Sequence, residues 1–352
     1  MSRPSRWVVL LLLGGLAAGA LGLLSYRLIY LQPLDEALER PYAAHRGTVL
    51  FRVGRGSTAE TIANRLEASG IVADRRVFLR GVARERLGSR LQAGLYHFEG
   101  ALTPLEVIAR IVDGEVATLP VTVPEGLDRQ GTAAVLARQG AGGADALLAA
   151  FSDPAAAERL IGDLDPDARD LEGYLFPSTY RLPPEAGPER VAAVLVGQFR
   201  ALWTERRRAR AEELGRSLRE IATLASIVEK ETGDPDERVL IASVFWNRLE
   251  RGMPLQSDPT VLFAMRQAGD TGNNIRRRDL DINSPYNTYR VGGIPPGPIA
   301  SFGIAALDAV LFPAETEFLY FVSRNDGTHE FNRSLREHNR AVRRWQVEYF
   351  RR

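Results

Sequence analysis

The chain of 352 residues contains no cysteine, which excludes disulfide bonds, thiolate zinc sites and cysteine nucleophiles. It has four histidines, none of them in an H-E-x-x-H pattern, and this excludes a zinc protease of that class. Lys230 is the only lysine, and the 45 basic residues are balanced by 44 acidic ones. Because a nucleic-acid-binding protein needs a net positive face, we expect no nucleic-acid partner.

The chain also has only one long apolar run, and that run lies near its start. Trp7 to Leu24 contains no charge, and the run continues through Tyr26. About 20 helical residues span the hydrocarbon core of a bilayer, so we predict a transmembrane helix over residues 7–26. A cleaved signal peptide is the competing interpretation, but its apolar region is shorter and ends at a small-x-small site, which is missing here.

The charges beside this run indicate its orientation. Arg3 and Arg6 precede it, and the positive-inside rule therefore predicts a cytoplasmic tail at residues 1–6. No later stretch approaches 18 apolar residues, so the rest of the chain is expected on the other side of the membrane, in the periplasm or its equivalent. Residues 27–46, with Pro33 and Pro41, are expected to form a polar tether.

Residues 47–118 alternate between strand and helix patterns. We expect strands at 47–53 and 94–99, and between them one helix capped by Ser57 and ended by Gly70, followed by a second over 74–86. A helix capped by Thr103 follows. This βααβ order resembles a LysM-type glycan-binding module, although a purely structural unit has the same order. The overall prediction is an α+β chain with a transmembrane helix, a small LysM-like domain and a mixed α/β domain over 119–352.

The larger domain has well-marked helix boundaries. "SLREIATLASIVEKETG", which begins at Ser217, predicts one helix, and Asp234, Pro235 and Gly252 delimit the next. Ser257 or Asp258 is expected to cap a third helix that starts at Pro259. "FLYFVSRNDGTHEF" predicts two strands about an Asp-Gly turn, before a C-terminal helix. "LEGYLFPSTYRL", 171–182, has three aromatic residues that suit either a core or a sugar-binding cleft.

Two glutamates end the first of these helices. Residues three, four and seven apart share a helix face, so Leu224, Ile227 and Val228 point the same way as Glu231. Glu229 lies about 200° away. Burial beside an apolar stripe raises the pKa of a carboxyl group, and a general acid for glycosidic cleavage must be protonated near neutral pH. The alternative is that Glu231 forms a salt bridge with Arg238 or Arg248.

Several long motifs resemble the YceG-like (MltG) family of endolytic murein transglycosylases. They are "LASIVEKETGDPDERVLIASVFWNRLERGMPLQSDPTV", "EGYLFPSTY", "NSPYNTY" with "GGIPPGPIAS", and "YFVSRNDGTHEFNRSLREHN". The resemblance implies a membrane-anchored enzyme that cleaves the MurNAc–GlcNAc β-1,4 bond of nascent peptidoglycan strands, leaves 1,6-anhydro-MurNAc ends and terminates elongation. It also implies action beside peptidoglycan synthases.

The resemblance places the catalytic glutamate of the family on Glu231, the residue that helical phasing also selects, with Glu229 as second choice. The substrate's own O6 hydroxyl is then the nucleophile, so one carboxyl group suffices and no metal or other cofactor is expected. Candidate substrate-binding residues have side chains that hydrogen-bond acetamido and hydroxyl groups: Asn247, Gln256, Asp258, Tyr286, Asn287 and Tyr289. Each of them also suits capping or turn formation.

Two other functions stay open at this point. A catalytically inactive, membrane-tethered peptidoglycan-binding scaffold would carry the same anchor and glycan-binding module. An inverting hydrolase would use two carboxyl groups and produce reducing muramyl ends.

Overall fold

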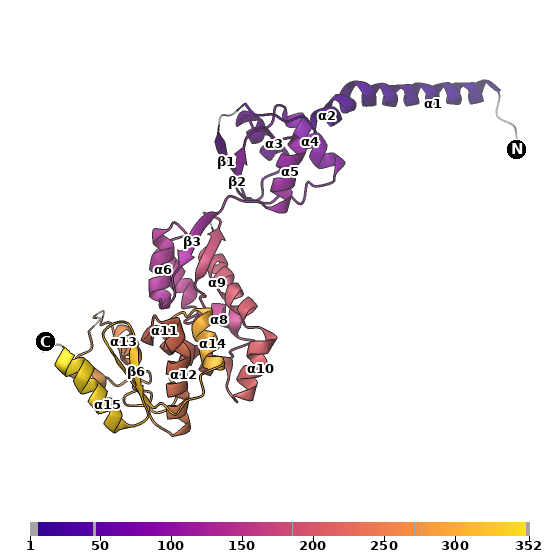
Figure 1. Cartoon of the computed structure of the whole chain (residues 1–352). Coiled ribbons are helices and arrows are strands. Elements are labelled where there is room, and N and C mark those ends of the chain that lie inside the picture. Colours follow the sequence, from indigo (N-terminus) through magenta and orange to yellow (C-terminus); the bar gives the residue numbers. More distant parts are fainter. Residues whose placement is uncertain (1–5, 45–46, 185, 271, 273, 350–352) are drawn as a thin grey trace. The chain divides into compact units, whose positions relative to one another are not determined.

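The structure is a computed structural model that describes residues 6–44, 47–184, 186–270, 272 and 274–349. It divides into two units, which Figure 1 shows along the chain. One contains Met1–Thr118 and Pro183–Glu185, and the other contains Leu119–Leu182 and Ala186–Arg352. Each unit mixes helices with short antiparallel sheets, so the chain is a mixed α/β protein.

The chain begins with an apolar helix, α1 (Arg6–Tyr26). It continues through a π-helical stretch, Arg27–Leu31, into α2 (Gln32–Ala37). The segment Gly14–Ala37 is long and apolar enough to cross a membrane, with a mean hydropathy of 1.3, and none of it is buried inside the protein. These features fit a single-pass membrane anchor. The expected cytoplasmic tail lies, apart from Arg6, outside the described residues.

The segment expected as a polar tether is different in the structure. It is helical up to Ala37, and Pro33 lies in the first turn of α2. Leu38 is fully buried, and Arg80 Nε donates to Asp35 Oδ1 at 2.8 Å. The first part of this segment therefore packs on the rest of the first unit.

The first unit has the strand–helix–helix–strand order that the sequence predicts. Its elements are β1 (Thr48–Val53), α3 (Ala59–Ala68), α4 (Arg75–Arg84), β2 (Gly94–Glu99) and α5 (Pro104–Asp113). The two strands pair antiparallel, with Phe51 opposite Tyr96, and their buried aromatic side chains face the helices. Thr58, not the expected Ser57, caps α3, because its hydroxyl accepts from the Thr61 N–H at 3.2 Å.

The second unit is mostly helical. Its first half contains β3 (Leu119–Val123), α6 (Arg129–Arg138), α7 (Ala144–Phe151), α8 (Pro154–Ile161), β4 (Ser178–Leu182), α9 (Pro188–Leu202) and α10 (Glu205–Glu213). Its second half contains α11 (Leu218–Glu231), α12 (Pro235–Glu250), α13 (Asp258–Gln267), a 3₁₀ turn (Arg277–Asp281), α14 (Ile304–Leu311), β5 (Tyr320–Ser323), β6 (His329–Asn332), α15 (Leu335–Val342) and a π-helical end (Arg343–Glu348).

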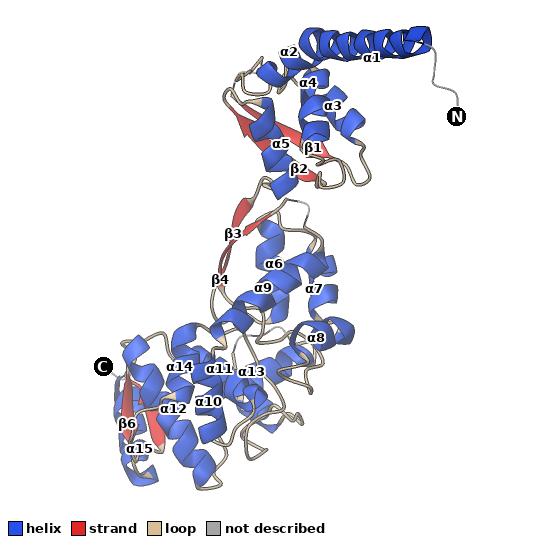
Figure 2. Ribbon diagram, turned by 90° about the vertical axis from the view of Figure 1, so that its right-hand side faces the viewer, coloured by secondary structure: helices blue, strands red, loops and turns tan. Residues whose placement is uncertain are grey.

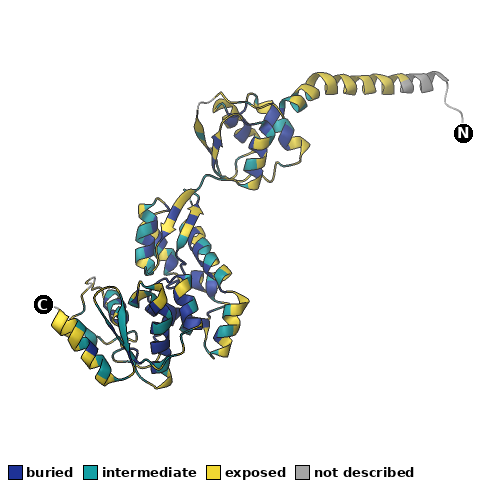
Figure 3. Cartoon of the chain, in the orientation of Figure 1, coloured by how far each residue is buried: buried dark blue, intermediate teal, exposed yellow. Residues whose placement is uncertain are grey.

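Helix α11 is the centre of this unit. It packs against α10, α12, α13 and α14, and Figure 3 shows that the buried residues of the unit gather there. Every residue from Ile221 to Val228 is buried, including the Ala222–Ala225 side. Helical phasing alone therefore does not separate Glu231 from Glu229, because both faces of the helix are enclosed.

The last elements form a layer of their own. β5 and β6 pair antiparallel about the predicted Asp326-Gly327 turn, and α15 lies against this hairpin (Figure 2). The "LEGYLFPSTYRL" segment belongs to the core, since Tyr174, Phe176 and Tyr180 are buried. Glu172 in the same segment is buried as well, and its carboxylate accepts from the Arg129 N–H.

Candidate active site

Glu231 is the last residue of α11, and the chain turns into an extended conformation at Thr232. Its side chain is partly exposed, and its Oε1 accepts a hydrogen bond from Ser257 Oγ at 2.5 Å. Among the described residues no ion pair joins Glu231 to Arg238 or Arg248, so the salt-bridge alternative does not hold here. The helix end delivers one carboxyl group to a pocket, with a hydroxyl group holding one of its oxygens.

The surroundings of Glu231 favour its protonated form. Burial of the carboxyl group raises its pKa to about 7, against the lowering effect of the Ser257 hydrogen bond. The negative charge of Asp258 raises this pKa further, and the positive charge of Arg248 lowers it. A carboxyl group whose pKa lies near neutral pH can both give and take a proton.

Ser257 is held in place by a set of threonine hydroxyl groups. Its N–H donates to Thr288 Oγ1 at 2.9 Å, and its carbonyl accepts from Thr260 Oγ1 at 2.6 Å. The two threonine hydroxyls are 2.8 Å apart, and Thr260, Thr288 and Ser257 are all buried. The preceding residue, Gln256, has a φ of +52°, a strained value for a non-glycine residue. This fixed geometry aims the Ser257 hydroxyl at Glu231.

The prediction that Ser257 or Asp258 caps α13 is confirmed for the position of Ser257 but not for a capping hydrogen bond. Ser257 occupies the N-cap position of α13, but its side chain makes no capping hydrogen bond within the described structure. Its hydroxyl donates to Glu231 instead, and the Asp258 carboxylate accepts from Tyr289 Oη at 2.6 Å. Asp258 therefore lines the pocket, whereas the buried Ser257 acts on it only through its hydrogen bond to Glu231.

Arg248 lies in the wall of the same pocket. It is buried, it donates to the carbonyls of Leu319 at 2.7 Å and Leu255 at 2.8 Å, and its guanidinium lies 5.1 Å from the centre of the Tyr320 ring. Burial lowers its pKa, but the group stays cationic at neutral pH. It is thus a fixed positive charge close to Glu231.

A cavity of about 450 Å³ opens in front of Glu231. This volume is in the range of small-molecule and sugar-sized sites. Its lining includes polar and aromatic groups from six parts of the chain: Glu231, Arg248, Gln256, Asp258, Tyr289, Tyr320, His338 and Asn339. The His338 ring stacks on Tyr320 with centroids 5.2 Å apart.

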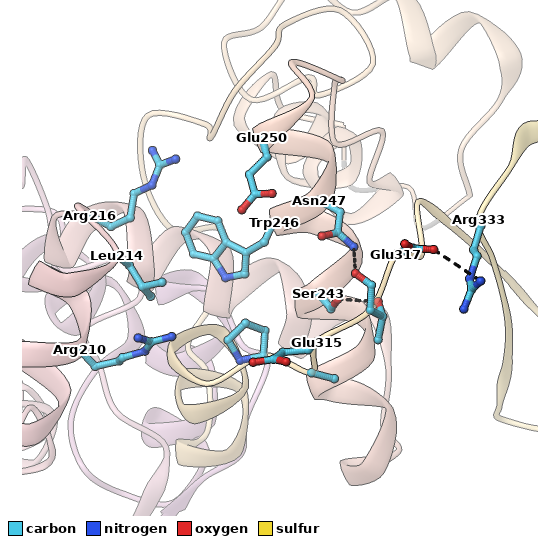
Figure 4. A pocket seen from close by; sticks show the side chains of 13 residues that line it. Arg210, Leu214, Arg216, Ser243, Trp246, Asn247, Glu250, Glu315, Glu317 and Arg333 are labelled. Carbon is cyan, nitrogen blue, oxygen red and sulfur yellow. Dashed lines mark hydrogen bonds and ion pairs between the residues drawn. The ribbon is translucent and has the colours of Figure 1, made fainter.

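Three of the six predicted substrate-binding residues line this cavity: Gln256, Asp258 and Tyr289. In the part of the chain that the structure describes, Asn247, Tyr286 and Asn287 do not. Asn247 lies in a different pocket, where Figure 4 shows it turned toward the loop after α14. Its amide donates to the carbonyls of Thr316 and Phe318, each at 2.9 Å.

The side chains of Asn287 and Tyr286 make contacts inside the fold. Asn287 is fully buried, and its amide donates to the Leu280 and Ile282 carbonyls at 2.9 Å each. Tyr286 packs edge-on against Phe263, with ring centroids 4.8 Å apart. These three side chains already have their partners inside the fold.

Glu229 has a different setting from Glu231. Its Oε2 accepts from the Gly303 N–H at 3.1 Å, and its Oε1 lies 3.5 Å from an Arg238 nitrogen. Burial raises its pKa, and the nearby charge of Glu125 acts in the same direction. Of the cavity linings described for the structure, none includes Glu229. Its carboxylate ties α11 to the loop before α14.

Sequence reasoning missed that Arg248, Tyr320 and His338 line the cavity and that Ser257 holds the Glu231 carboxyl group. Two of these residues were noticed for other reasons, Ser257 as a cap and Arg248 as an ion-pair partner. The two long motifs at 224–261 and 320–339 contain all four side chains. Only the fold brings residues 231, 248, 320 and 338 to one cavity and places Ser257 against Glu231.

Residues 51–344 match the model of the YceG-like family. This chain belongs to the YceG-like family. Among its relatives, the endolytic murein transglycosylase of Bacillus subtilis (strain 168) is 31% identical over 333 residues, which is 90% of this chain and 89% of the relative. The protein of the same name from Streptococcus pneumoniae (strain D39) is 29% identical over 95% of this chain, which spans 63% of that longer relative.

A solved structure supports the same assignment to the family. The 2.6 Å crystal structure of a putative yceG-like protein from Listeria monocytogenes matches with a TM-score of 0.58 and 28% identity. The match covers 84% of this chain and 99% of that one.

Proposed function

We propose that this protein is a membrane-anchored endolytic murein transglycosylase whose general acid and base is Glu231. The observation that carries the proposal is the single carboxyl group at the end of α11, with a pKa of about 7, held by Ser257 at the wall of a 450 Å³ cavity. Two relatives that align with at least 90% of this chain have the name endolytic murein transglycosylase.

The reaction needs only one carboxyl group. Glu231 donates its proton to the glycosidic oxygen as the bond from that oxygen to C1 of MurNAc breaks. The O6 hydroxyl of the same MurNAc then attacks C1, and its proton passes to the Glu231 carboxylate. The products are a strand with a free GlcNAc 4-hydroxyl and a strand with a 1,6-anhydro-MurNAc end. No water is consumed, and Glu231 returns to its protonated state.

The remaining groups of the cavity bind and orient the sugar in this proposal. Gln256 and the Asp258–Tyr289 pair offer hydrogen bonds to hydroxyl and acetamido groups, and Tyr320 offers an aromatic face. Arg248 places a fixed positive charge on the side where Glu231 becomes anionic. In this proposal, residues 119–352 form the catalytic domain and residues 7–26 form the membrane anchor.

We also propose the topology and the role of the first unit. Residues 1–6 face the cytoplasm, and the chain after the anchor faces the periplasm or cell exterior, beside the synthases that supply nascent strands. Protease added to spheroplasts should then degrade both units.

The LysM-like unit, residues 47–118, binds glycan. Deletion of 48–113 should weaken retention of the protein on insoluble murein, and unchanged retention would assign this unit a structural role.

Asp258 supports one competing reaction. It lies in the cavity with Glu231, and an inverting hydrolase uses such a second carboxylate to activate water. Cleavage of purified glycan strands in ¹⁸O-labelled water separates the two reactions. We expect unlabelled 1,6-anhydro ends. Labelled reducing ends would establish hydrolysis, and a protein that binds strands without cleaving them would be a scaffold.

A further inference from the structure

The C-terminal helix carries an exposed group of arginines next to the cavity. Arg336, Arg340 and Arg343, here called the arginine surface, follow one another at spacings of four and three residues and so lie on one side of the helix. All three side chains are exposed, and they line a hollow of about 720 Å³. The fourth arginine of the hollow, Arg344, donates to Glu330 at 3.0 Å and is already paired.

This hollow adjoins the cavity of Glu231. Leu335 and Asn339 line both, because they occupy the side of α15 between the arginine surface and the β5–β6 hairpin. A ligand that occupies the cavity and extends past Asn339 therefore meets the arginine surface next. The two hollows together offer a path longer than a single sugar.

The charges of the arginine surface are poorly balanced. Among the described residues, no ion pair within 4.0 Å involves Arg336, Arg340 or Arg343, whereas Arg207 is paired with Asp308 at 2.7 Å. Glu337 on the same helix is engaged by the N–H groups of Ser334 and Arg333. Glu348 is the acidic residue in the lining of the hollow. Such a cluster, in a chain with a net charge of only +1, is suited to an anionic ligand.

We propose that the arginine surface binds carboxylates of the short peptides that murein strands carry on their MurNAc residues, while the glycan lies in the Glu231 cavity. The proposal rests on the function proposed above. Guanidinium groups bind carboxylates through paired N–H donors, which makes arginine suited to this ligand. The surface then gives the enzyme a preference for strands that still carry their peptides over stripped glycan.

The test compares two substrates and three proteins. The substrates are purified glycan strands with their peptides and the same strands after an amidase has removed the peptides, which leaves on each MurNAc only the short lactyl carboxylate next to the sugar ring. The proteins are the full chain, the triple variant Arg336→Glu, Arg340→Glu, Arg343→Glu, and a control of equal charge change, Arg159→Glu, Arg169→Glu, Arg190→Glu. The control residues are exposed and belong to the same unit, and no described cavity lining includes them.

We expect the triple variant to lower kcat/KM on peptide-bearing strands roughly tenfold, because three exposed ion pairs contribute modestly each. On stripped strands it should change kcat/KM by less than about threefold, and the control variant should leave both values near those of the full chain. The effect of the triple variant on peptide-bearing strands should shrink in about 1 M salt, because the Debye length is then roughly 3 Å. A triple Arg→Gln variant at the same positions should also lose kcat/KM on peptide-bearing strands relative to stripped strands, but the loss should be smaller.

Equal losses on both substrates, or no loss, would overturn the proposal. The proposal would also be overturned if the triple variant kept its substrate preference but no longer bound vesicles of anionic phospholipid. The arginine surface would then contact the membrane. The function proposed above fails separately: in that case the unaltered protein cleaves neither kind of strand.

Discussion

Glu229 and Glu231 are two residues apart on one helix and are both partly buried, but their side chains have different partners. Glu229 accepts a backbone N–H from Gly303 and lies beside Arg238, so its charge is used to join two segments. Glu231 has one hydroxyl partner and faces a cavity. The comparison shows that burial alone does not identify a catalytic carboxyl group: what distinguishes Glu231 is an accessible cavity and a partner that leaves it free to exchange a proton.

Glu231→Gln should have the largest effect of any single change. The amide is nearly isosteric and neutral, so the fold and strand binding should persist, but it has no proton to donate to the leaving oxygen. We expect the cleavage rate to fall by at least ~10²–10⁴-fold, as for loss of general acid catalysis. Release of 1,6-anhydro ends from purified strands measures this. Retained activity in Glu231→Gln together with an inactive Glu229→Gln would transfer the acid to Glu229.

Ser257→Ala should have the next largest effect. It removes the hydroxyl that orients the Glu231 carboxyl group, and we expect kcat to fall about tenfold, since a hydrogen bond to a charged group contributes roughly 1.5–3 kcal/mol. Ser257→Thr keeps the hydroxyl and should restore most of the rate. If Ser257→Ala cleaves strands as fast as the unaltered protein, Ser257 does not orient Glu231 for catalysis.

Glu229→Gln should mainly affect stability. The amide oxygen can still accept from Gly303, but Arg238 loses a buried negative neighbour, and Glu125 alone remains 4.0 Å away. We expect a loss of about 1–2 kcal/mol in the free energy of unfolding and less than about a fivefold change in kcat. Chemical denaturation and strand cleavage on the same preparation measure the two effects. A large loss of kcat without a loss of stability would contradict this view of Glu229.

The smallest effect concerns stability and pH. The folded pKa of Glu231, about 7, is above the value of an unfolded glutamate, so the folded state holds this proton more tightly. The contribution of Glu231 to stability is therefore present at acidic pH and is lost as the pH rises toward 7 and above. Glu231→Gln should be more stable than the unaltered protein at pH 8, by roughly 1 kcal/mol, and equal to it near pH 4.5. Equal melting curves at both pH values would argue against the raised pKa.

Local sequence patterns predicted much of this structure. The helix limits at Asp234, Pro235 and Gly252 and the turn at Asp326-Gly327 are set by capping and backbone preferences within a few residues, and the structure confirms them. Glu231 could be chosen as the candidate acid because a motif resemblance pointed to it. Helical phasing agreed, but the structure shows that α11 is buried on both faces, so this agreement alone would not have decided between the two glutamates.

The partners of polar side chains could not be predicted in the same way. The pattern around Ser257 suits a helix cap, yet Thr260 and Thr288 hold it so that its hydroxyl reaches Glu231, 26 residues earlier in the chain. Asn247 carries an amide that suits sugar binding, but the carbonyls of Thr316 and Phe318, about 70 residues later in the chain, already occupy it. Such partners depend on contacts between segments far apart in the sequence, which spacing and composition do not specify.

The pH dependence of kcat/KM on purified strands tests most directly whether the surroundings of Glu231 make it the acid. The account predicts an alkaline limb with an apparent pKa near 7, the same limb in Glu229→Gln, and a limb at higher pH in Ser257→Ala, because the lost hydrogen bond had stabilised the ionised carboxylate. A profile without this limb, or a limb that moves in Glu229→Gln and stays in place in Ser257→Ala, would contradict it.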